Sequence, residues 1–318
     1  YDHGTSTLMA GGEPYEVTTF RRDVETDGRR AVVAYSTDMF EDAARRDFTM
    51  NALYADADGH IHDPLGGLPD LEARHLRFIG KAEDRIAEDH LRILRFFRFN
   101  AIYGRHDGDI DPKGLFACAN RREGLSKISA ERIGAEMRKI LGAENPSRTV
   151  ELMAVTGVLE QILPGANPFS MTALMRHEAS AGLKPDPMRR LASLGLDDVT
   201  DALRLSRVEA KQLRQFRDAL DGDELAGEVG YRYGAEAKSI LALRAAVNGS
   251  ILEPDAIMAA GRGAEQRFPV TARDLIPEYS GSELGARLKE IEAEWIASDF
   301  SLTKDDLLYA EDDEPGMM

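Results

Sequence analysis

Residues 88–98 are the segment that most restricts how this chain can fold. On a helix with 100° per residue, apolar side chains cover most of the circumference of this segment, so the helix must be buried. Asp89, Arg92, Arg95 and Arg98 follow one another at three-residue steps and form a slanting ridge. Because a buried arginine needs a partner, we expect the ridge to line a cleft that receives a phosphate or a polar base edge.

A packed helix whose arginines pair with neighbouring acids explains the same ridge equally well. Glu83, Asp84 and Glu88 precede or overlap the ridge and are the nearest candidates for such pairs. Each pair would satisfy a guanidinium without any ligand. The segment alone leaves both interpretations open.

The composition is typical of a globular protein without membrane spans. Hydrophobic residues make up 43% of the 318 residues and charged residues 30%. Since no apolar run approaches the ~20 residues of a membrane span, we expect no membrane partner. The single cysteine, Cys118, excludes an internal disulfide and a cysteine-based zinc site, which favours a reducing, cytoplasmic setting.

The net charge of −16 argues against a nucleic-acid partner only if its distribution is ignored. Residues 81–140 carry 13 basic and 10 acidic side chains, a net of +3. Residues 221–318 carry 9 basic and 21 acidic side chains, a net of −12, and the acidic run at 311–314 is expected to be a solvated terminus. The middle of the chain therefore remains compatible with RNA.

Strand patterns are confined to the beginning of the sequence. The expected strands are residues 4–10, 14–22, 31–35, 53–56 and 60–63, with hairpin turns at Gly11-Gly12 and Asp58-Gly59 and a polar loop at 23–30. From residue 68 onward, helical periodicity interrupted by Gly and Pro continues to the end, with one long helix expected near 83–104. We therefore predict an α+β fold that is predominantly α-helical.

A second polar cluster lies at residues 45–53, within an expected helix at 42–52. Arg46 or Asp47 and Asn51 would then share one helix face, so a cation, an acceptor and an amide could bind one ligand. Arginine presents a planar fork to phosphate oxygens, and a carboxylate accepts from a ribose hydroxyl. The start of a solvated helix is the simpler explanation when this cluster is taken alone.

Four motifs in a fixed order support a family assignment. They are EVTTFR at 16–21, RRDFTMNAL at 45–53, DPLGGLPDL at 63–71 and EDHLRILRFFR at 88–98. Together they resemble the class II tRNA nucleotidyltransferase and poly(A) polymerase family, and residues 268–300 are similar to its bacterial CCA-adding members. The resemblance is dense over residues 2–140 and loose beyond.

The resemblance implies addition of CMP and AMP, from CTP and ATP, to the acceptor end of tRNA. Asp89 and Arg92 would bind the edge of the incoming base, because cytosine and adenine each offer an amino donor beside a ring acceptor. The other nucleotide-binding residues it implies are Arg46, Arg95 and Arg98 for the triphosphate and Asp47 for the ribose 2′-hydroxyl. The helical body would hold tRNA by shape and phosphate contacts, and no DNA partner is expected.

Turn residues near 80, at 142–146 and near 222 interrupt the helical periodicity and predict four domains, whose roles the resemblance implies. They are a partial nucleotidyltransferase head with a small antiparallel sheet at residues 1–80, an elongated helical neck at 81–142 that selects the nucleotide, a helical body at 143–222 and an RNA-binding helical tail at 223–318. The paired glycines at 66 and 67 fit a tight joint between the head and the neck.

One family feature is missing from the sequence. The resemblance implies Mg²⁺ bound by two aspartates in a D-x-D strand, which we expect upstream of Tyr1, with Glu16 as a possible additional carboxylate. The D-x-D strings present, at 56/58, 107/109/111 and 221/223, lie at turns beside glycine, so we expect no metal ligands in this chain. The alternatives are therefore A-adding, CC-adding or poly(A) activity, or a nucleotide- or RNA-binding fragment without catalysis.

Overall fold

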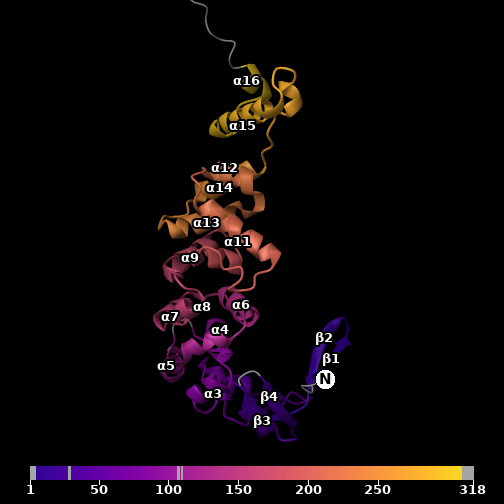
Figure 1. Ribbon diagram of the computed structural model, residues 1–318, viewed down its shortest axis with the longest axis vertical. Helices are drawn as coiled ribbons and strands as arrows, with labels where there is room; N and C mark the ends of the chain where they lie inside the picture. Colours follow the sequence, from indigo (N-terminus) through magenta and orange to yellow (C-terminus); the bar gives the residue numbers. More distant parts are fainter. Residues whose placement is uncertain (1–4, 28–29, 106–107, 109, 310–318) are drawn as a thin grey trace, which may run out of the picture. The chain divides into compact units, whose positions relative to one another are not determined.

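The computed structural model describes residues 5–27, 30–105, 108 and 110–309 (Figure 1). The acidic run at 311–314 and the aspartates at 107 and 109 lie outside this part of the chain. The chain divides into two compact units, one made of residues 1–172 and 185–213 and the other of residues 173–184 and 214–318. The division into four domains stays a prediction.

Six short strands pair as three separate two-stranded antiparallel sheets in the described part of the first unit. The pairs are β1 (Thr5–Ala10) with β2 (Glu13–Thr18), β3 (Arg21–Asp27) with β4 (Arg30–Tyr35), and β5 (Tyr54–Ala55) with β6 (Ile61–His62). Gly11 and Gly12 close the first hairpin with φ of 61° and 87°, a region that favours glycine. Both predicted hairpins are confirmed, whereas the loop predicted at 23–30 is wrong, because β3 extends to Asp27.

The helix predicted at 42–52 is also wrong. Helix α1 (Met39–Ala44) begins earlier because the Asp38 carboxylate accepts from Phe40 N at 2.8 Å. The backbone beyond it pairs with residues 77–79: Thr49 N donates to Arg77 O at 3.0 Å and Ile79 N donates to Asp47 O at 3.0 Å. Only a 3-10 turn, η1 (Thr49–Asn51), follows. These backbone hydrogen bonds to a distant segment of the same chain replace the hydrogen bonds of the predicted helix.

Helices make up most of the remainder of the first unit. They are α2 (Leu68–Glu72), α3 (Ala82–Glu88), α4 (Leu91–Tyr103), α5 (Pro112–Arg121), α6 (Ala130–Leu141), α7 (Ser147–Val155), α8 (Val158–Ile162) and α10 (Pro187–Ala192), with 3-10 turns η2 (Arg122–Lys127) and η3 (Pro168–Ser170). Helices α9 (Met171–Ser180) and α11 (Arg207–Leu220) contribute residues to both units.

The long helix predicted near 83–104 is two helices. Asp89 has φ −153° and ψ 108°, an extended conformation that ends α3. Its carboxylate accepts from Leu91 N at 3.0 Å, which satisfies one of the free backbone donors at the start of α4. The ridge therefore consists of three arginines on α4 and one aspartate in the break before it.

A cluster of phenylalanines forms the core around α4. The ring centroids of Phe48 and Phe78 are 4.8 Å apart, and those of Phe78 and Phe96 are 5.4 Å apart with nearly parallel planes. The exposed fractions of these three side chains are 0%, 3% and 0%. The cluster joins the segment after α1, the linker before α3, and α4.

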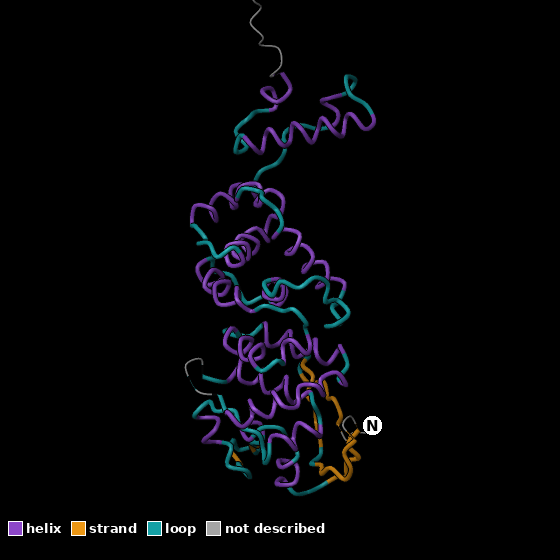
Figure 2. Tube along the Cα trace, turned by 60° about the vertical axis from the view of Figure 1, so that its left-hand side comes forward, coloured by secondary structure: helices purple, strands orange, loops and turns teal. Residues whose placement is uncertain are grey.

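The second unit contains helices but no strand among its described residues, and it has a hydrophobic cluster of its own. Its helices are α12 (Ala226–Tyr233), α13 (Ala237–Val247), α14 (Pro254–Ala264), α15 (Gly281–Ala297) and α16 (Lys304–Tyr309), with 3-10 turns η4 (Gly234–Glu236) and η5 (Ala272–Leu275). The buried Trp295 packs with Val270, Ile291 and Leu307. The strands are confined to the N-terminal region (Figure 2), which confirms the predicted, mostly helical α+β fold.

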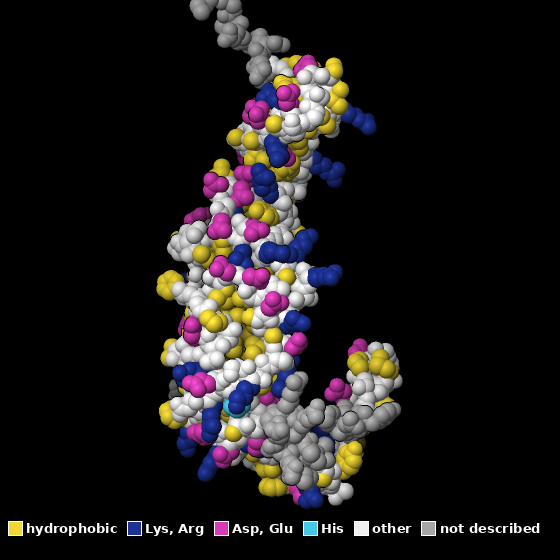
Figure 3. Space-filling model, viewed as in Figure 1, with side chains coloured by type: hydrophobic (Ala, Val, Ile, Leu, Met, Phe, Trp, Pro, Cys, Tyr) yellow, Lys and Arg dark blue, Asp and Glu magenta, His cyan; other side chains and the backbone are white. Residues whose placement is uncertain are grey.

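Charged side chains of both signs are interspersed over the helices on the face drawn in Figure 3. Because the net charge is −16, attraction for a polyanion must come from local groups of basic side chains. None of the described helices combines the length and the apolar character needed to cross a membrane.

The phenylalanine cluster gives a stability prediction. Phe96→Ala should lower the free energy of unfolding by about 3–5 kcal/mol, because it removes a fully buried ring and leaves a cavity. Phe116→Ala is the matched control, since 63% of that side chain is exposed. Urea unfolding of both variants measures the difference, and equal stabilities would contradict the assignment of this core.

Candidate functional site

A cleft of about 390 Å³ brings together the two polar clusters of the first unit. Six arginines and two aspartates are among the described residues that line it: Arg21, Arg45, Arg46, Asp47, Asn51, Asp89, Leu91, Arg92, Arg95 and Arg132. Five of the predicted nucleotide-binding residues, Arg46, Asp47, Asp89, Arg92 and Arg95, are therefore neighbours. The excess of guanidinium groups suits an anionic ligand.

Two predicted site residues do not line this cleft. Arg98 Nε donates to Glu136 Oε2 at 2.6 Å, and the Arg98 guanidinium lies 4.4 Å from the centre of the Phe99 ring. Glu16 is exposed on β2, opposite Thr7 of β1. A role for either residue in nucleotide binding or catalysis stays a prediction.

Every member of the ridge has a partner of opposite charge. Arg95 Nε donates to Asp47 Oδ2 at 2.5 Å, and Arg92 Nη1 donates to Glu88 Oε2 at 2.5 Å. Of the three acids expected as partners, only Glu88 has a recorded ion pair with the ridge. Arg92 and Arg95 are thus both paired and cleft-lining, whereas Arg98 is paired outside the cleft. Pairing of the ridge with acids is confirmed, and binding of an anion by the cleft stays a prediction.

Asp47 is the most buried acid of the cleft, with an exposed fraction of 4%. Besides Arg95, its carboxylate accepts from Asn51 Nδ2 at 3.0 Å. Burial raises the pKa of Asp47, but the charge and hydrogen bond of Arg95, helped by Asn51, outweigh burial and leave the pKa below its ordinary value. Asp47 is therefore a fixed anion in this cleft, and Asn51 joins it through a 3-10 turn rather than along a helix.

Asp42, which was not among the predicted site residues, binds two of the arginines that line the cleft. Its carboxylate accepts from Arg45 Nε at 3.0 Å, Arg46 Nη2 at 3.1 Å and the Tyr54 hydroxyl at 2.8 Å. Burial raises the pKa of Asp42, but the hydrogen bonds from Tyr54 and Arg45 lower it by more than burial raises it. The pKa of Asp42 is therefore below its ordinary value. The three- and four-residue spacing to the two arginines was the signal available in the sequence.

Burial, together with the Asp42 hydrogen bond, raises the pKa of Tyr54 to about 12. The hydroxyl therefore stays protonated at neutral pH and continues to donate to Asp42. This keeps one more donor on the carboxylate that holds Arg45 and Arg46.

Arg92 is held by backbone carbonyls as well as by Glu88. Its Nη1 donates to Arg85 O at 2.9 Å and its Nη2 donates to Arg45 O at 3.2 Å. A guanidinium has five N–H donors, so these contacts fix its plane and leave donors for a ligand. The bond to Arg45 O ties α4 to the segment after α1.

Asp89 is held from two directions. Oδ1 accepts from Leu91 N at 3.0 Å and Oδ2 accepts from Arg132 Nη2 at 2.6 Å. Since each carboxylate oxygen offers two lone pairs, Asp89 can accept another hydrogen bond while both contacts persist. Arg132 and Glu136 both belong to α6, so that helix braces α4 and the break before it through two ion pairs.

The two carboxylates that line the cleft do not form a site for Mg²⁺. Both carboxylates of the cleft, Asp47 and Asp89, are occupied by arginines. Among the described residues, the group with metal-ligand spacing is Asp56, Asp58 and His60, which is exposed. Asp56 Oδ1 there accepts from Asp58 N at 3.0 Å and His60 N at 2.9 Å, so it closes the β5–β6 hairpin.

Acid should weaken the Asp47–Arg95 pair. Because the pKa of Asp47 is lower in the folded protein than in the unfolded chain, its contribution to stability is present above about pH 4 and is lost as the pH falls through the folded pKa. Asp47→Asn should cost about 1.5–3 kcal/mol near pH 7, and less in acid. Denaturant unfolding against pH measures this, with the exposed Asp201→Asn as control; a difference that grows in acid would contradict the assignment.

Two family models match the chain. The "Poly A polymerase head domain" model matches residues 1–77, and the model described as "Probable RNA and SrmB- binding site of polymerase A" matches residues 109–170. The first match includes Arg46 and Asp47, whereas Asp89 and Arg92 lie between the two.

The chain is also similar to curated proteins over nearly its whole length. It is 35% identical to the mitochondrial CCA tRNA nucleotidyltransferase 1 of Mus musculus, over 96% of this chain and 74% of the relative. It is 34% identical to the Homo sapiens protein of that name, with the same coverage. A CCA-adding enzyme of Streptococcus pyogenes is 42% identical over 52% of this chain and 40% of the relative.

Solved structures share the fold. The CCA-adding enzyme of Bacillus stearothermophilus in complex with CTP matches with a TM-score of 0.71 and 26% identity, over 94% of this chain and 78% of that chain. The Thermotoga maritima CCA-adding enzyme complexed with tRNA matches with a TM-score of 0.65 and 20% identity, over 96% of this chain and 77% of that chain.

Proposed function

Because the chain belongs to the CCA-adding tRNA nucleotidyltransferase family, we propose that it transfers CMP and AMP from CTP and ATP to the 3′ end of tRNA, with release of pyrophosphate. The observation that carries the proposal is the arginine-lined cleft, in which Asp89 and Arg92 lie beside Arg46, Asp47 and Arg95. A cleft of this kind offers contacts for each part of a nucleoside triphosphate.

We propose that Asp89 and Arg92 select the base. A carboxylate accepts from the amino group of cytosine or adenine, and a guanidinium donates to the adjacent ring nitrogen. Uracil and guanine present the opposite polarity at these positions, so each would leave a buried donor facing a donor. The contacts of Asp89 with Leu91 N and Arg132, and those of Arg92 with two carbonyls, support this role because they hold both groups before a base arrives.

Arg46 and Arg95 would bind the triphosphate. Each side chain forms an ion pair with an acid, Arg46 with Asp42 and Arg95 with Asp47. These ion pairs restrict the side-chain rotamers and so lower the entropic cost of binding a ligand. Asp47 would accept from the ribose 2′-hydroxyl through Oδ2. That oxygen accepts from Arg95 Nε and keeps a second lone pair, whereas Oδ1 already accepts from Asn51 Nδ2 and Phe48 N.

In the proposed reaction, the 3′-hydroxyl oxygen of tRNA attacks the α-phosphorus of the bound nucleotide. A P–O bond forms, the bond to the β-phosphate oxygen breaks, the hydroxyl proton is released and pyrophosphate leaves. The arginines would orient the triphosphate and balance its charge. Mg²⁺ is the cofactor we propose from the family, and the expectation that its ligands lie upstream of Tyr1 stays a prediction.

The tRNA acceptor end, CTP and ATP are the partners we propose, in keeping with the ligands named for the related structures. The matched RNA-binding model at 109–170 supports an RNA contact in the first unit. Cytoplasmic localisation also stays a prediction, since the vertebrate relatives are named as mitochondrial.

Incorporation assays test the reaction. The chain, incubated with Mg²⁺, labelled CTP or ATP and tRNA that lacks its terminal CCA, should extend the RNA by C, C and A, as resolved on a sequencing gel. Supplying one nucleotide at a time to tRNAs that end before CC or before A separates CCA addition from CC or A addition, and long A tails would indicate poly(A) synthesis. CTP binding without any incorporation would contradict catalysis by this chain.

Asp89→Ala tests the selection of the base. Preference for CTP and ATP over UTP and GTP should fall about 10-fold or more, because an unpaired buried donor costs on the order of 1–3 kcal/mol. The matched control is Asp84→Ala, an exposed acid on the preceding helix. Competition between nucleotides in the incorporation assay measures the preference, and unchanged selectivity would exclude Asp89 as the selecting group.

A further inference from the structure

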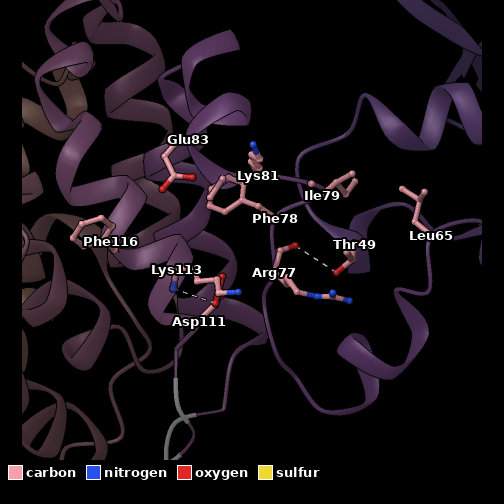
Figure 4. A pocket seen from close by; sticks show the side chains of 12 residues that line it. Thr49, Leu65, Arg77, Phe78, Ile79, Lys81, Glu83, Asp111, Lys113 and Phe116 are labelled. Carbon is pink, nitrogen blue, oxygen red and sulfur yellow. Dashed lines mark hydrogen bonds between the residues drawn. The ribbon is translucent and has the colours of Figure 1, made fainter.

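A second cavity of the first unit, of about 560 Å³, is lined by Phe78 of the phenylalanine cluster and by residues that follow it. Thr49, Arg77 and Phe78 form one wall, and Lys113 and Phe116 of α5, with its N-cap Asp111, come from the opposite side (Figure 4). The two cavities share no lining residue among those described. Its volume is typical of small-molecule pockets, which span roughly 300–1,000 Å³.

Two lysines of this cavity have no ion-pair partner within the described part of the chain, although two acids, Glu83 and Asp111, also line it. Lys81 and Lys113 are exposed, and the structure records no ion pair for either within the described residues. Arg77 differs, because its Nε and Nη2 donate to Asp70 Oδ2 at 3.0 and 2.8 Å. The ammonium groups are therefore the cations available to an anionic ligand.

An exposed ring stands beside these lysines. Phe116 lines the cavity with 63% of its side chain exposed, whereas Phe48, Phe78 and Phe96 of the same unit are buried. An exposed phenyl face next to basic side chains is the combination on which nucleic-acid bases stack. Covering it would also remove apolar surface from water.

The acids of the cavity are not equivalent. Asp111 Oδ1 and Oδ2 accept from Lys113 N at 3.3 Å and Gly114 N at 3.0 Å, so this carboxylate caps α5. Glu83 has no recorded hydrogen bond among the described residues and is the free acceptor. A ribose hydroxyl or an amino group of a base would satisfy it.

We propose that this cavity binds a nucleotide unit, with its base on Phe116, its phosphate at Lys113 and Lys81, and a ribose hydroxyl or amino group at Glu83. The aromatic face, the ammonium groups and the acceptor match the base, phosphate and hydroxyl or amino groups of a nucleotide. The unit is either a free nucleotide or one residue of an RNA chain. The site is separate from the proposed nucleotide-selecting cleft and does not depend on the function proposed for that cleft.

Fluorescence anisotropy with 5′-fluorescein-labelled hexa-adenylate tests this site, measured with and without saturating CTP. Phe116→Ala should weaken binding by about 5- to 100-fold, the usual effect of removing one stacking platform. Lys113→Ala should reduce the slope of log affinity against log salt by about 0.7, the share of one phosphate contact. Thermal unfolding of each variant checks that it remains folded.

Phe169→Ala is the matched control, because Phe169 is 86% exposed and does not line the cavity. The control should bind like the unaltered chain. Unchanged binding by both cavity variants, or an equal loss in the control, would overturn the proposal. Displacement of the probe by AMP identifies a free nucleotide as the ligand, whereas displacement by unlabelled hexa-adenylate alone identifies RNA.

Discussion

The burial of the Phe48 side chain is the constraint on which the structure of the first unit depends. Its ring is fully buried against Phe78 and near Phe96, and the backbone on both sides of it is bonded to residues 77–79. The residues on either side of this ring line different cavities: Asp47 lines the arginine-lined cleft, and Thr49, where the 3-10 turn η1 begins, lines the second cavity. One buried ring therefore fixes the position of a wall in each cavity.

The cleft is rigid because its charges are bound to one another before any ligand arrives. Asp42 holds Arg45 and Arg46, Asp47 holds Arg95, and Arg132 holds Asp89. Such pre-organised groups need little rearrangement when a charged substrate enters. The arginines still outnumber the aspartates, so the cleft remains attractive to a polyanion although the chain as a whole is acidic.

Local patterns predicted much of the fold. The two hairpins and the helical body follow from alternation, turn residues and helical periodicity, which act over a few neighbouring residues. One error arose from distant contacts, because the segment after Ala44 pairs with residues 77–79 instead of continuing a helix. Another is local: Asp89 is extended and its side chain accepts from Leu91 N, which divides the helix predicted near 83–104.

The sequence by itself determined the kind of site. It places acids and arginines at set spacings on a segment too apolar to be exposed, and its motifs follow one another in the order of a nucleotidyltransferase. Only the tertiary structure decided which charges meet. Arg132 reaches Asp89 across 43 positions and Arg95 reaches Asp47 across 48. Arg98 belongs to the same ridge, but its side chain donates to Glu136 and does not line the cleft. Such pairs depend on how α4 packs against α6 and the other segments around it. The sequence of a helix determines which face each side chain lies on, but not which other segment packs against that face.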